Sequence, residues 1–320
     1  MVISLSANDI RAVANWPFLI EALRQGHRLA RADIGDTFVH ARGNTMLVRS
    51  AWIDGLAAGV KAATVVPQNA KRSLPSIHAQ IMLFDDEMGA LSALVDGTEV
   101  TAWKTAADSA LGCDLLAPKD VDTFLMIGAG AMAEPLIRAH LSVRPCISNI
   151  LLWNRTTAKA HDLATRLADL PQSVAVVDDL IDAIPQADII SCATMSAEPV
   201  LAGAKVTPGT HVDLVGAYRA DMREADDDLH RAGRWFVDSY DTTLDHIGEF
   251  TIPVQAGVIQ REAVQGDLHE LVAGNAGRGH EDEITVFKNG GGAHLDIMVA
   301  SALVEEFRTR SDVSESGADA

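Results

Sequence analysis

Residues 121–160 read VDTFLMIGAGAMAEPLIRAHLSVRPCISNILLWNRTTAKA and contain the most informative pattern of the sequence. It begins with an apolar run at residues 124–127, which is short enough to be a strand buried on both faces. A G-x-G-x-x-A sequence follows at residues 128–133 and leads into a predicted helix. A second apolar run at residues 150–153 predicts the next strand. This order of strand, glycine-rich turn, helix and strand is typical of a dinucleotide-binding βαβ unit.

The residues of the glycine-rich turn have distinct expected roles. Gly128 permits the tight turn, Gly130 lets the backbone approach a pyrophosphate, and the small Ala133 lets the helix pack on the strand. The helix, expected from about Ala131 to Ser142, directs its first N–H groups at the phosphates. The alternative is a turn of the same shape without a ligand. We expect a bound dinucleotide, contacted by Gly128, Ala129, Gly130, Ala131 and Met132.

The second predicted strand ends in Asn154, Arg155 and Thr156. An acidic residue at this point would accept hydrogen bonds from the ribose 2′-hydroxyl of NAD. The three residues instead offer a cation and neutral donors, which suit a 2′-phosphate. The sequence therefore predicts NADPH as the cofactor, with NADH possible but less preferred.

Length and charge limit the classes of protein. A chain of 320 residues is long enough for two domains, and 48% hydrophobic residues with a mean hydropathy of +0.11 indicate a globular protein with an ample core. The net charge of −18 argues against nucleic acid and anionic membranes as partners. No apolar run approaches the length of a membrane span, and the N-terminus does not resemble a signal peptide. We expect a cytoplasmic protein.

The cysteines and known motifs exclude other chemistries. Cys113, Cys146 and Cys192 are odd in number and lack metal-ligand spacing, so we expect reduced thiols in the core and no metal site. No HExxH, GxSxG or P-loop pattern occurs, so metalloprotease, serine hydrolase and kinase functions have no support.

The first third of the chain mixes helices and strands. Apolar residues at helical spacing predict a helix from Asp9 to about Arg31. Strand-like patterns follow between residues 38 and 66, and residues 77–84 form a predicted hairpin with residues 90–95. A helix then begins at Thr98 or Thr101.

From residue 121 to residue 288 predicted strands alternate with helices, which implies a doubly wound parallel sheet of Rossmann type that binds ligands at the carboxyl ends of its strands. A closing helix from Ala293 to about Arg310 is apolar enough to pack on the first domain. We expect an α+β domain for substrate binding and dimerisation over residues 1–117, with 293–320 returning to it, and a dinucleotide-binding domain over residues 118–292.

Four residues of the first domain could bind substrate. Lys61 lies inside the apolar run GVKAATVV, where a lysine is either an edge-strand charge or a cation directed at an anionic ligand. Arg42, in a turn-like ARGN, and Lys104, near the start of its helix, would ordinarily be surface residues. His78, in the middle of a strand, would more often be a core histidine than a catalytic one.

The order of motifs resembles the ornithine cyclodeaminase and mu-crystallin family over nearly the whole chain. The stretches that carry the resemblance include GVKAATVVPQNAKRSLPSIHAQIMLF, IGAGAMAE, WNRTTAKA, SCATMSAEPVL, GTHVDLVGAYRADMREAD and EITVFKNGGGAHLDIMVA. The resemblance implies a homodimer formed through the N-terminal domain and a substrate bound between the domains, facing the nicotinamide.

The resemblance also implies roles for individual residues. Arg42 and Lys61 match the family's cations for the substrate carboxylate, whereas Lys104 falls where the family typically has arginine. Arginine would bind a carboxylate through two parallel hydrogen bonds, and lysine offers only a point charge. Further cofactor contacts carry over to Asn154, Arg155, Thr156, Thr194, Val215, Gly216, Asn289 and Gly290.

A second departure separates the branches of the family. Cyclodeaminases carry an aspartate after the glycine that follows VDLVG, where this chain has Tyr218, and a lysine where it has Met222. Tyrosine cannot replace a carboxylate base at neutral pH, so the pattern resembles the mu-crystallin and ketimine reductase branch. Reduction requires only that the protein orient the nicotinamide and an electrophilic C=N carbon and balance their charges.

We therefore expect NADPH-dependent reduction of small 2-imino carboxylates. The best candidates are Δ1-pyrroline-2-carboxylate and Δ1-piperideine-2-carboxylate, which give L-proline and L-pipecolate. Lys61, Arg42 and Lys104 would hold the carboxylate, and His78 would donate a proton or orient the substrate. The alternatives are an ornithine cyclodeaminase, an alanine dehydrogenase or iminosuccinate reductase, and a mu-crystallin-like protein that binds NADPH and a ligand without catalysis.

Overall fold

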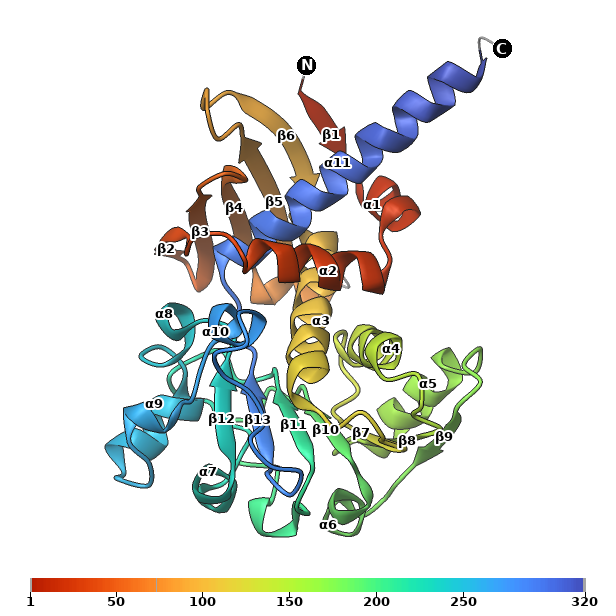
Figure 1. Ribbon diagram of the computed structural model, residues 1–320, viewed down its shortest axis with the longest axis vertical. Helices are drawn as coiled ribbons and strands as arrows, with labels where there is room; N and C mark the ends of the chain where they lie inside the picture. The colour runs from red at the N-terminus through yellow and green to blue at the C-terminus, as the bar shows by residue number, and fades with distance from the viewer. Residues whose placement is uncertain (1, 73, 319–320) are drawn as a thin grey trace. The chain divides into compact units, whose positions relative to one another are not determined.

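The computed structural model describes residues 2–72 and 74–318 (Figure 1). The chain divides into two compact units. The first comprises the residues up to Lys104 and those from Gly292 onward, and the second comprises Thr105–Gly291. The division falls within helix α3 (Gly97–Leu116), and each unit is built on one sheet.

The first unit contains a six-stranded sheet in the order β1-β6-β5-β4-β3-β2. Neighbouring strands are antiparallel, except that β1 pairs in parallel with β6. The strands are β1 (Ile3–Leu5), β2 (Asp33–Ala41), β3 (Asn44–Ile53), β4 (Ala57–Val65), β5 (Ile77–Phe84) and β6 (Leu91–Asp96). The strand patterns expected between residues 38 and 66, and the hairpin of β5 and β6, are confirmed.

The single helix expected from Asp9 to Arg31 is wrong, because the segment forms two helices, α1 (Ala7–Val13) and α2 (Trp16–Gly26). The side chain of Asn15 accepts a hydrogen bond from the N–H of Phe18 and so begins α2. Proline in the first turn of α2 has no N–H to continue the preceding helix. A short 3-10 helix, η1 (Pro67–Arg72), follows β4.

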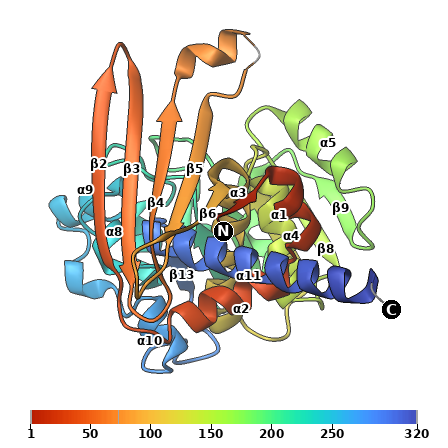
Figure 2. The same cartoon turned by 90° about the horizontal axis from the view of Figure 1, so that it is seen from above.

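The closing helix α11 (Ala293–Ala318) covers one face of this sheet and extends beyond the expected end near Arg310. It lies across β3, β4 and β5, beside α2 (Figure 2). The approach is close, since a Cβ atom at Gly59 would lie 2.1 Å from the Cδ1 atom of Ile297. The odd-numbered residues of β4 therefore face α11, and the even-numbered residues face away from it.

The second unit contains a seven-stranded parallel sheet in the order β12-β13-β11-β10-β7-β8-β9 (Figure 1). The expected doubly wound sheet of Rossmann type is confirmed. The strands are β7 (Thr123–Ile127), β8 (Asn149–Trp153), β9 (Ser173–Val176), β10 (Ile189–Cys192), β11 (His211–Leu214), β12 (Arg234–Val237) and β13 (Thr285–Lys288). The strand order reverses beside β7, and ligands of such sheets bind at this point.

Short helices connect these strands. The α-helices are α4 (Ala133–Val143), α5 (Thr157–Arg166), α6 (Leu180–Ala183), α7 (Asp227–Ala232), α8 (Tyr240–Thr243), α9 (Gly248–Gln255) and α10 (Leu268–Val272), and the 3-10 helices are η2 (Ile184–Gln186), η3 (Gly203–Lys205) and η4 (Arg261–Ala263). In the described part of the chain, no helix is both long enough and apolar enough to span a membrane.

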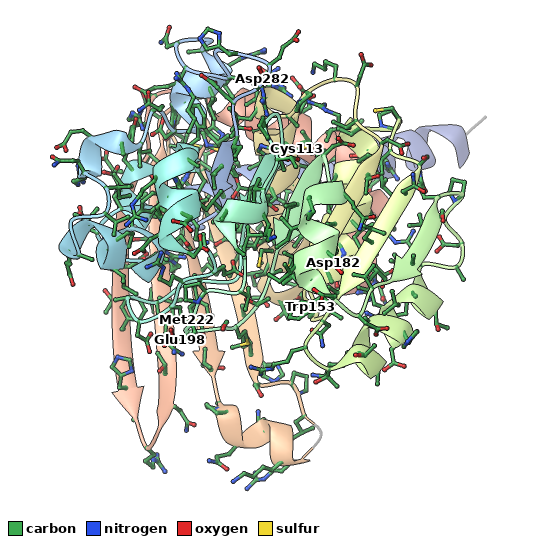
Figure 3. All side chains as sticks on the ribbon, turned by 90° about the horizontal axis from the view of Figure 1, so that it is seen from below. Cys113, Trp153, Asp182, Glu198, Met222 and Asp282 are labelled. Atoms are coloured by element: carbon green, nitrogen blue, oxygen red, sulfur yellow. The ribbon has the colours of Figure 1, made fainter. Side chains whose placement is uncertain are left out.

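The cysteines only partly follow expectation. Cys113, which Figure 3 labels, and Cys192 are buried as predicted. Cys146 is exposed, so the expectation that it belongs to the core is wrong. It lies in the loop before β8, where its thiol donates a hydrogen bond to the carbonyl of Lys119.

Candidate active site

The glycine-rich turn has the geometry of a phosphate-binding loop. Gly128 adopts a φ of 110°, and a Cβ atom there would lie 2.7 Å from the carbonyl oxygen of Ala193. Gly130 is exposed, and a Cβ atom there would meet no atom within 4 Å. No side chain caps the first turn of α4. The N–H of Ala133 donates to the carbonyl of Gly130 and Pro135 has no N–H, so the N–H of Glu134 remains available to an anion.

Asn154 connects the glycine-rich turn to the end of β8. Its Oδ1 atom accepts a hydrogen bond from the N–H of Ala129 at 3.1 Å, and its Nδ2 atom donates to the carbonyl of Thr156 at 2.9 Å. Arg155 and Thr156 are exposed directly beside this connection. Among the described residues, Arg155 has no hydrogen-bond or ion-pair partner, so its guanidinium is free to bind an anionic group.

Glu224 joins the carboxyl ends of β10 and β11. Its Oε1 atom accepts hydrogen bonds from the N–H of Thr194 at 2.7 Å and from the hydroxyl of Thr194 at 2.8 Å. Its Oε2 atom accepts from the N–H of Gly216 at 2.6 Å. Glu224 is fully buried and holds Thr194 and Gly216 in place, yet sequence analysis assigned it no role. The charged sequence around Glu224 gave no signal of its burial.

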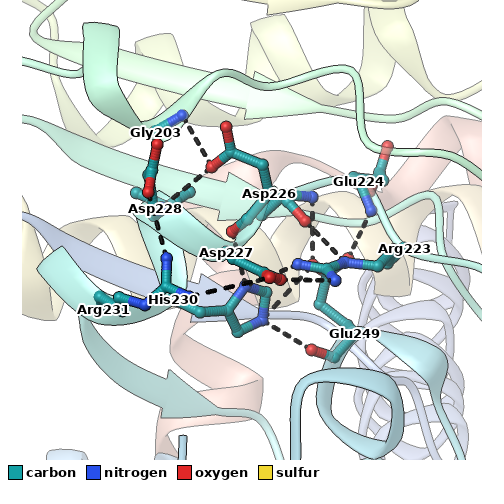
Figure 4. A network of polar contacts seen from close by, with 11 residues as sticks. Gly203, Arg223, Glu224, Asp226, Asp227, Asp228, His230, Arg231 and Glu249 are labelled. Atoms are coloured by element: carbon teal, nitrogen blue, oxygen red, sulfur yellow. Dashed lines mark hydrogen bonds and ion pairs between the residues drawn. The ribbon is translucent and has the colours of Figure 1, made fainter. Parts of the chain in front are cut away.

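A second buried carboxylate supports the first. Glu249 accepts hydrogen bonds from the N–H groups of Glu224 at 2.7 Å and Ala225 at 3.1 Å (Figure 4). Burial raises the pKa of Glu224, and it raises the pKa of Glu249 to about 7. The ammonium group of the buried Lys288 opposes both shifts. This polar network contacts Thr194 and Gly216, which follow the strand ends expected to receive the nicotinamide.

Hydrogen bonds also hold the residues that follow β13 in place. The Nδ2 atom of Asn289 donates to the carbonyl of Thr105 at 2.9 Å and to the hydroxyl of Ser109 at 3.0 Å. The N–H of Gly290 donates to Asp238 at 2.8 Å. The Asn289 amide nitrogen and the Gly290 N–H therefore hold the chain in place, and cofactor contact there would have to use other atoms.

In the first unit, Lys61 is buried within a polar cluster. Only 9% of the residue is exposed. Its ammonium group donates hydrogen bonds to Thr101 Oγ1 at 2.6 Å and to Asp296 Oδ1 at 2.9 Å. Burial lowers the pKa of Lys61, while the charge of Asp296 opposes the shift. Sequence analysis missed Asp296, although it is an acidic residue in the first turn of an apolar helix.

Lys104 adds a second buried cation. It is 5% exposed, and its charge lies close enough to lower the pKa of Lys61 further. In residues 2–72 and 74–318 it has no hydrogen-bond or ion-pair partner. Of these two buried ammonium groups, only that of Lys61 pairs with a buried carboxylate, that of Asp296. Because burying an unpaired charge is costly, the arrangement is suited to an anionic ligand.

Arg42 does not lie beside these lysines. It is exposed, with a φ of 54°, in the turn between β2 and β3. Strand pairing places Arg49 opposite Lys61, and Arg42 precedes Arg49 by seven residues. At about 3.3 Å per residue, Arg42 is roughly 20 Å from the level of Lys61. Its predicted role beside Lys61 and Lys104 is not supported by this geometry.

His78 lies on the other face of the sheet. Lys61 pairs with Ile81, whereas His78 pairs with Thr64, so His78 and Lys61 project to opposite faces. His78 is also exposed, so the expectation of a core histidine is wrong. Its alternative role as a proton donor beside Lys61 would require contact across the sheet.

The loop after β11 has no carboxylate at the position that separates the family branches. Tyr218 is 55% exposed, with the guanidinium of Arg219 over its ring. Met222, labelled in Figure 3, is buried with Ala217 and Ile247. Asp221, the nearest acidic residue in sequence, is paired with Arg219 at 2.8 Å. A lyase mechanism that needs a free carboxylate at position 218 has no such group there.

No group of three or more His, Cys, Asp or Glu side chains that could hold a metal ion occurs among the described residues.

Comparison with known proteins gives consistent matches. The sequence model of the ornithine cyclodeaminase/mu-crystallin family matches residues 31–311. The chain is 50% identical over 298 residues to the Δ1-pyrroline-2-carboxylate reductase of Paracoccus denitrificans, covering 93% of this chain and 94% of the relative.

Solved structures agree with these sequence matches. The Δ1-pyrroline-2-carboxylate reductase of Thermococcus litoralis, in complex with NADH and L-proline, has a TM-score of 0.91 at 30% identity, covering 97% of this chain and 98% of that one. An archaeal alanine dehydrogenase dimer with bound NAD has a TM-score of 0.90 at 25% identity, covering 97% of both chains.

Proposed function

Because the chain belongs to the ornithine cyclodeaminase/mu-crystallin family, we propose that it reduces small 2-imino carboxylates with NADPH. The proposed substrates are the cyclic ketimines Δ1-pyrroline-2-carboxylate and Δ1-piperideine-2-carboxylate. The corresponding products are L-proline and L-pipecolate. Sequence relatives named Δ1-pyrroline-2-carboxylate reductase support the choice of a C=N reductase over a lyase.

The observation that carries the proposal is the buried lysine pair. Lys61 and Lys104 are nearly inaccessible to solvent, and Asp296 neutralises only one of them. A substrate carboxylate would supply the missing negative charge. Charge-assisted hydrogen bonds of this kind are stronger than neutral ones, particularly where water is excluded.

The proposed reaction asks the protein mainly to position and to balance charge. When bound, the nicotinamide supplies a hydride from C4 to the imine carbon. Lys61 and Lys104 would hold the carboxylate, so that the positively charged iminium is directed away from the cations. Thr101 and Asp296 fix the ammonium group of Lys61, which orients the carboxylate before reaction. Arg42 and His78 have no role in this mechanism.

The cofactor would be held by the second unit. The glycine-rich turn and the N-terminus of α4 suit its pyrophosphate, and Arg155 and Thr156 suit the 2′-phosphate of NADPH. Glu224 would keep Thr194 and Gly216 in position near the nicotinamide. Preference for NADPH over NADH therefore depends on Arg155, which has no acidic neighbour at position 154 to repel a phosphate.

We further propose a homodimer formed through the sheet of the first unit. Val39, Met46 and Trp52 are exposed on the face opposite α11, with Val39 directly opposite Met46. Exposed apolar patches of this kind often mark protein interfaces. The archaeal alanine dehydrogenase of similar structure is described as a dimer. Light scattering on wild type and on Met46→Asp measures the oligomeric state, and a monomeric wild type would refute this arrangement.

The substrate is tested with a panel of imino acids and NADPH. The panel contains five- and six-membered cyclic imines and the acyclic imines formed from ammonia with pyruvate or oxaloacetate. We expect the highest kcat/KM for a cyclic imine. A higher value for the pyruvate-derived imine would favour an alanine dehydrogenase, and no turnover of any imine would favour a binding protein.

Lys104→Arg is the matched variant for this panel. It keeps the positive charge, but the larger guanidinium can donate two parallel hydrogen bonds to a substrate carboxylate. If Lys104 binds the carboxylate, the ranking of substrates by size should change. An unchanged ranking would remove Lys104 from the proposed site.

A further inference from the structure

We propose that Arg49, oriented by Asp36, is a third cation of the carboxylate site and determines how tightly that site binds 2-imino carboxylates. The inference rests on the proposed function and adds to it a residue on strand β3. Sequence analysis had instead assigned this role to Arg42.

Strand register places Arg49 beside Lys61. The two residues are direct partners in the antiparallel pairing of β3 and β4. Side chains of directly opposed residues project to the same face, with Cβ atoms about 4.5–5.5 Å apart. Arg49 therefore shares the face of the sheet on which Lys61 contacts Thr101 and Asp296.

The orientation of the guanidinium leaves donors for a ligand. Its Nε atom donates to Asp36 Oδ2 at 2.9 Å, and its Nη2 atom lies 2.8 Å from the same oxygen. Its Nη1 atom has no partner among the residues that the structure describes. Asp36 thus fixes one edge of the guanidinium, while the Nη1 donors stay available to a carboxylate.

The side chain lies at the edge of the buried cluster. It is 22% exposed, compared with 11% for the side chain of Lys61. The charge of Arg49 is one of the causes that lower the pKa of Lys61, as expected for neighbouring cations. Arg49 is therefore close to the lysine pair and reachable by a small ligand from solvent.

Counting charges indicates what the cluster binds. With Lys61 protonated, the cations are Lys61, Lys104 and Arg49, and the carboxylates are Asp36 and Asp296. One positive charge is left over, which a single carboxylate would neutralise.

The test compares Arg49→Met with Arg42→Met. Pyrrole-2-carboxylate serves as a planar, unreactive carboxylate probe, and pyrrole-2-carboxamide as its uncharged counterpart. Arg49→Met should raise the KM for Δ1-pyrroline-2-carboxylate and the inhibition constant of pyrrole-2-carboxylate by about ten- to a hundredfold. Inhibition by the carboxamide and the KM for NADPH should change less than twofold. Arg42→Met should change all four constants less than twofold.

Two further variants test folding and orientation. Arg49→Lys keeps the charge and should recover part of the lost affinity, which separates ligand binding from a folding defect. Asp36→Asn keeps the shape but weakens the orientation of Arg49, so its effect should have the same sign and be smaller. Equal loss of carboxylate and carboxamide inhibition in Arg49→Met would overturn the inference, as would Arg42→Met having the larger effect.

The inference and the proposed function fail in different ways. If the wild type reduces no imine, the proposed function is wrong. Calorimetric binding of pyrrole-2-carboxylate to wild type and Arg49→Met then still decides whether Arg49 binds a carboxylate. If the wild type reduces cyclic imines and Arg49→Met does so with an unchanged KM, only the assignment of Arg49 is wrong.

Discussion

Replacing Lys61 with methionine should destabilise the first unit as well as impair catalysis. Methionine matches the length of the lysine stem but removes the ammonium group that donates to Asp296 at 2.9 Å and to Thr101 at 2.6 Å. Asp296 is 1% exposed, so its carboxylate would remain buried without its cation. Removing one partner of a buried ion pair typically costs about 3–5 kcal/mol.

The position of Asp296 indicates that the loss of stability lies at the lower end of this range. Asp296 lies in the first turn of α11, where the helix dipole favours a negative charge by about 0.3–1 kcal/mol. Lys104 also lies close to Lys61, and its charge can partly compensate for the loss. We therefore expect Lys61→Met to lower the free energy of unfolding by about 3 kcal/mol.

The assay is urea-induced unfolding followed by tryptophan fluorescence at neutral pH. The double variant Lys61→Met/Asp296→Asn should be more stable than Lys61→Met alone, because the uncompensated charge is gone. Asp296→Asn alone serves as the matched control. A loss below about 1 kcal/mol for Lys61→Met, or a double variant no more stable than the single one, would refute the argument that this pair is buried and coupled.

Three other predictions follow from the second unit. Arg155→Ala should raise the KM for NADPH much more than the KM for NADH, because Arg155 is exposed and unpaired in the described chain; equal effects in steady-state kinetics with both cofactors would contradict its assignment to the 2′-phosphate. Incubation with L-ornithine and NAD should release no ammonia at enzymatic rates, since Tyr218 stands where the cyclodeaminases have a carboxylate; rapid ammonia release would return the chain to the lyases. Burial raises the pKa of Glu249 to about 7, so the folded state binds more protons than the unfolded state and stability falls as the pH rises from about 4.5 to 7. Glu249→Gln should flatten this dependence by about 1–3 kcal/mol in urea unfolding at pH 5 and pH 8, and an unchanged slope would show that Glu249 does not titrate there.

Local sequence was sufficient to predict the second unit. The turn at Gly128 requires a positive φ, and an added Cβ atom would clash with Ala193, so the glycine pattern reflects a direct steric need. The apolar runs of β7 and β8 are short because both faces of a parallel sheet are covered. Such constraints act over a few residues and can be recognised without the fold.

Residues brought together by strand register or distant contacts could not be identified in this way. Lys61 and Asp296 are 235 positions apart, and their ion pair depends on α11 returning to the sheet. The face on which His78 projects depends on the pairing of β4 with β5. A shift by one residue would reverse it, and hydrophobic spacing alone could not fix that register. Arg49 escaped notice for the same reason.

Buried acidic residues were missed for a related cause. Glu224 lies in a segment rich in charged residues, which ordinarily indicates a solvent-exposed loop. Its burial follows from hydrogen bonds to Thr194 and Gly216, at the ends of two separate strands. Only the assembled sheet brings those N–H groups close enough to bind a single carboxylate.

The central claim is that the buried lysine pair serves a substrate carboxylate in NADPH-dependent imine reduction. The most direct measurement follows NADPH consumption and amino-acid formation together, with Δ1-pyrroline-2-carboxylate as substrate. The account predicts one equivalent of L-proline for each NADPH oxidised by the wild type, and almost none of either in Lys61→Met under conditions where that variant is folded and binds NADPH. Full turnover by folded Lys61→Met, or NADPH oxidation by the wild type without formation of L-proline, would contradict it.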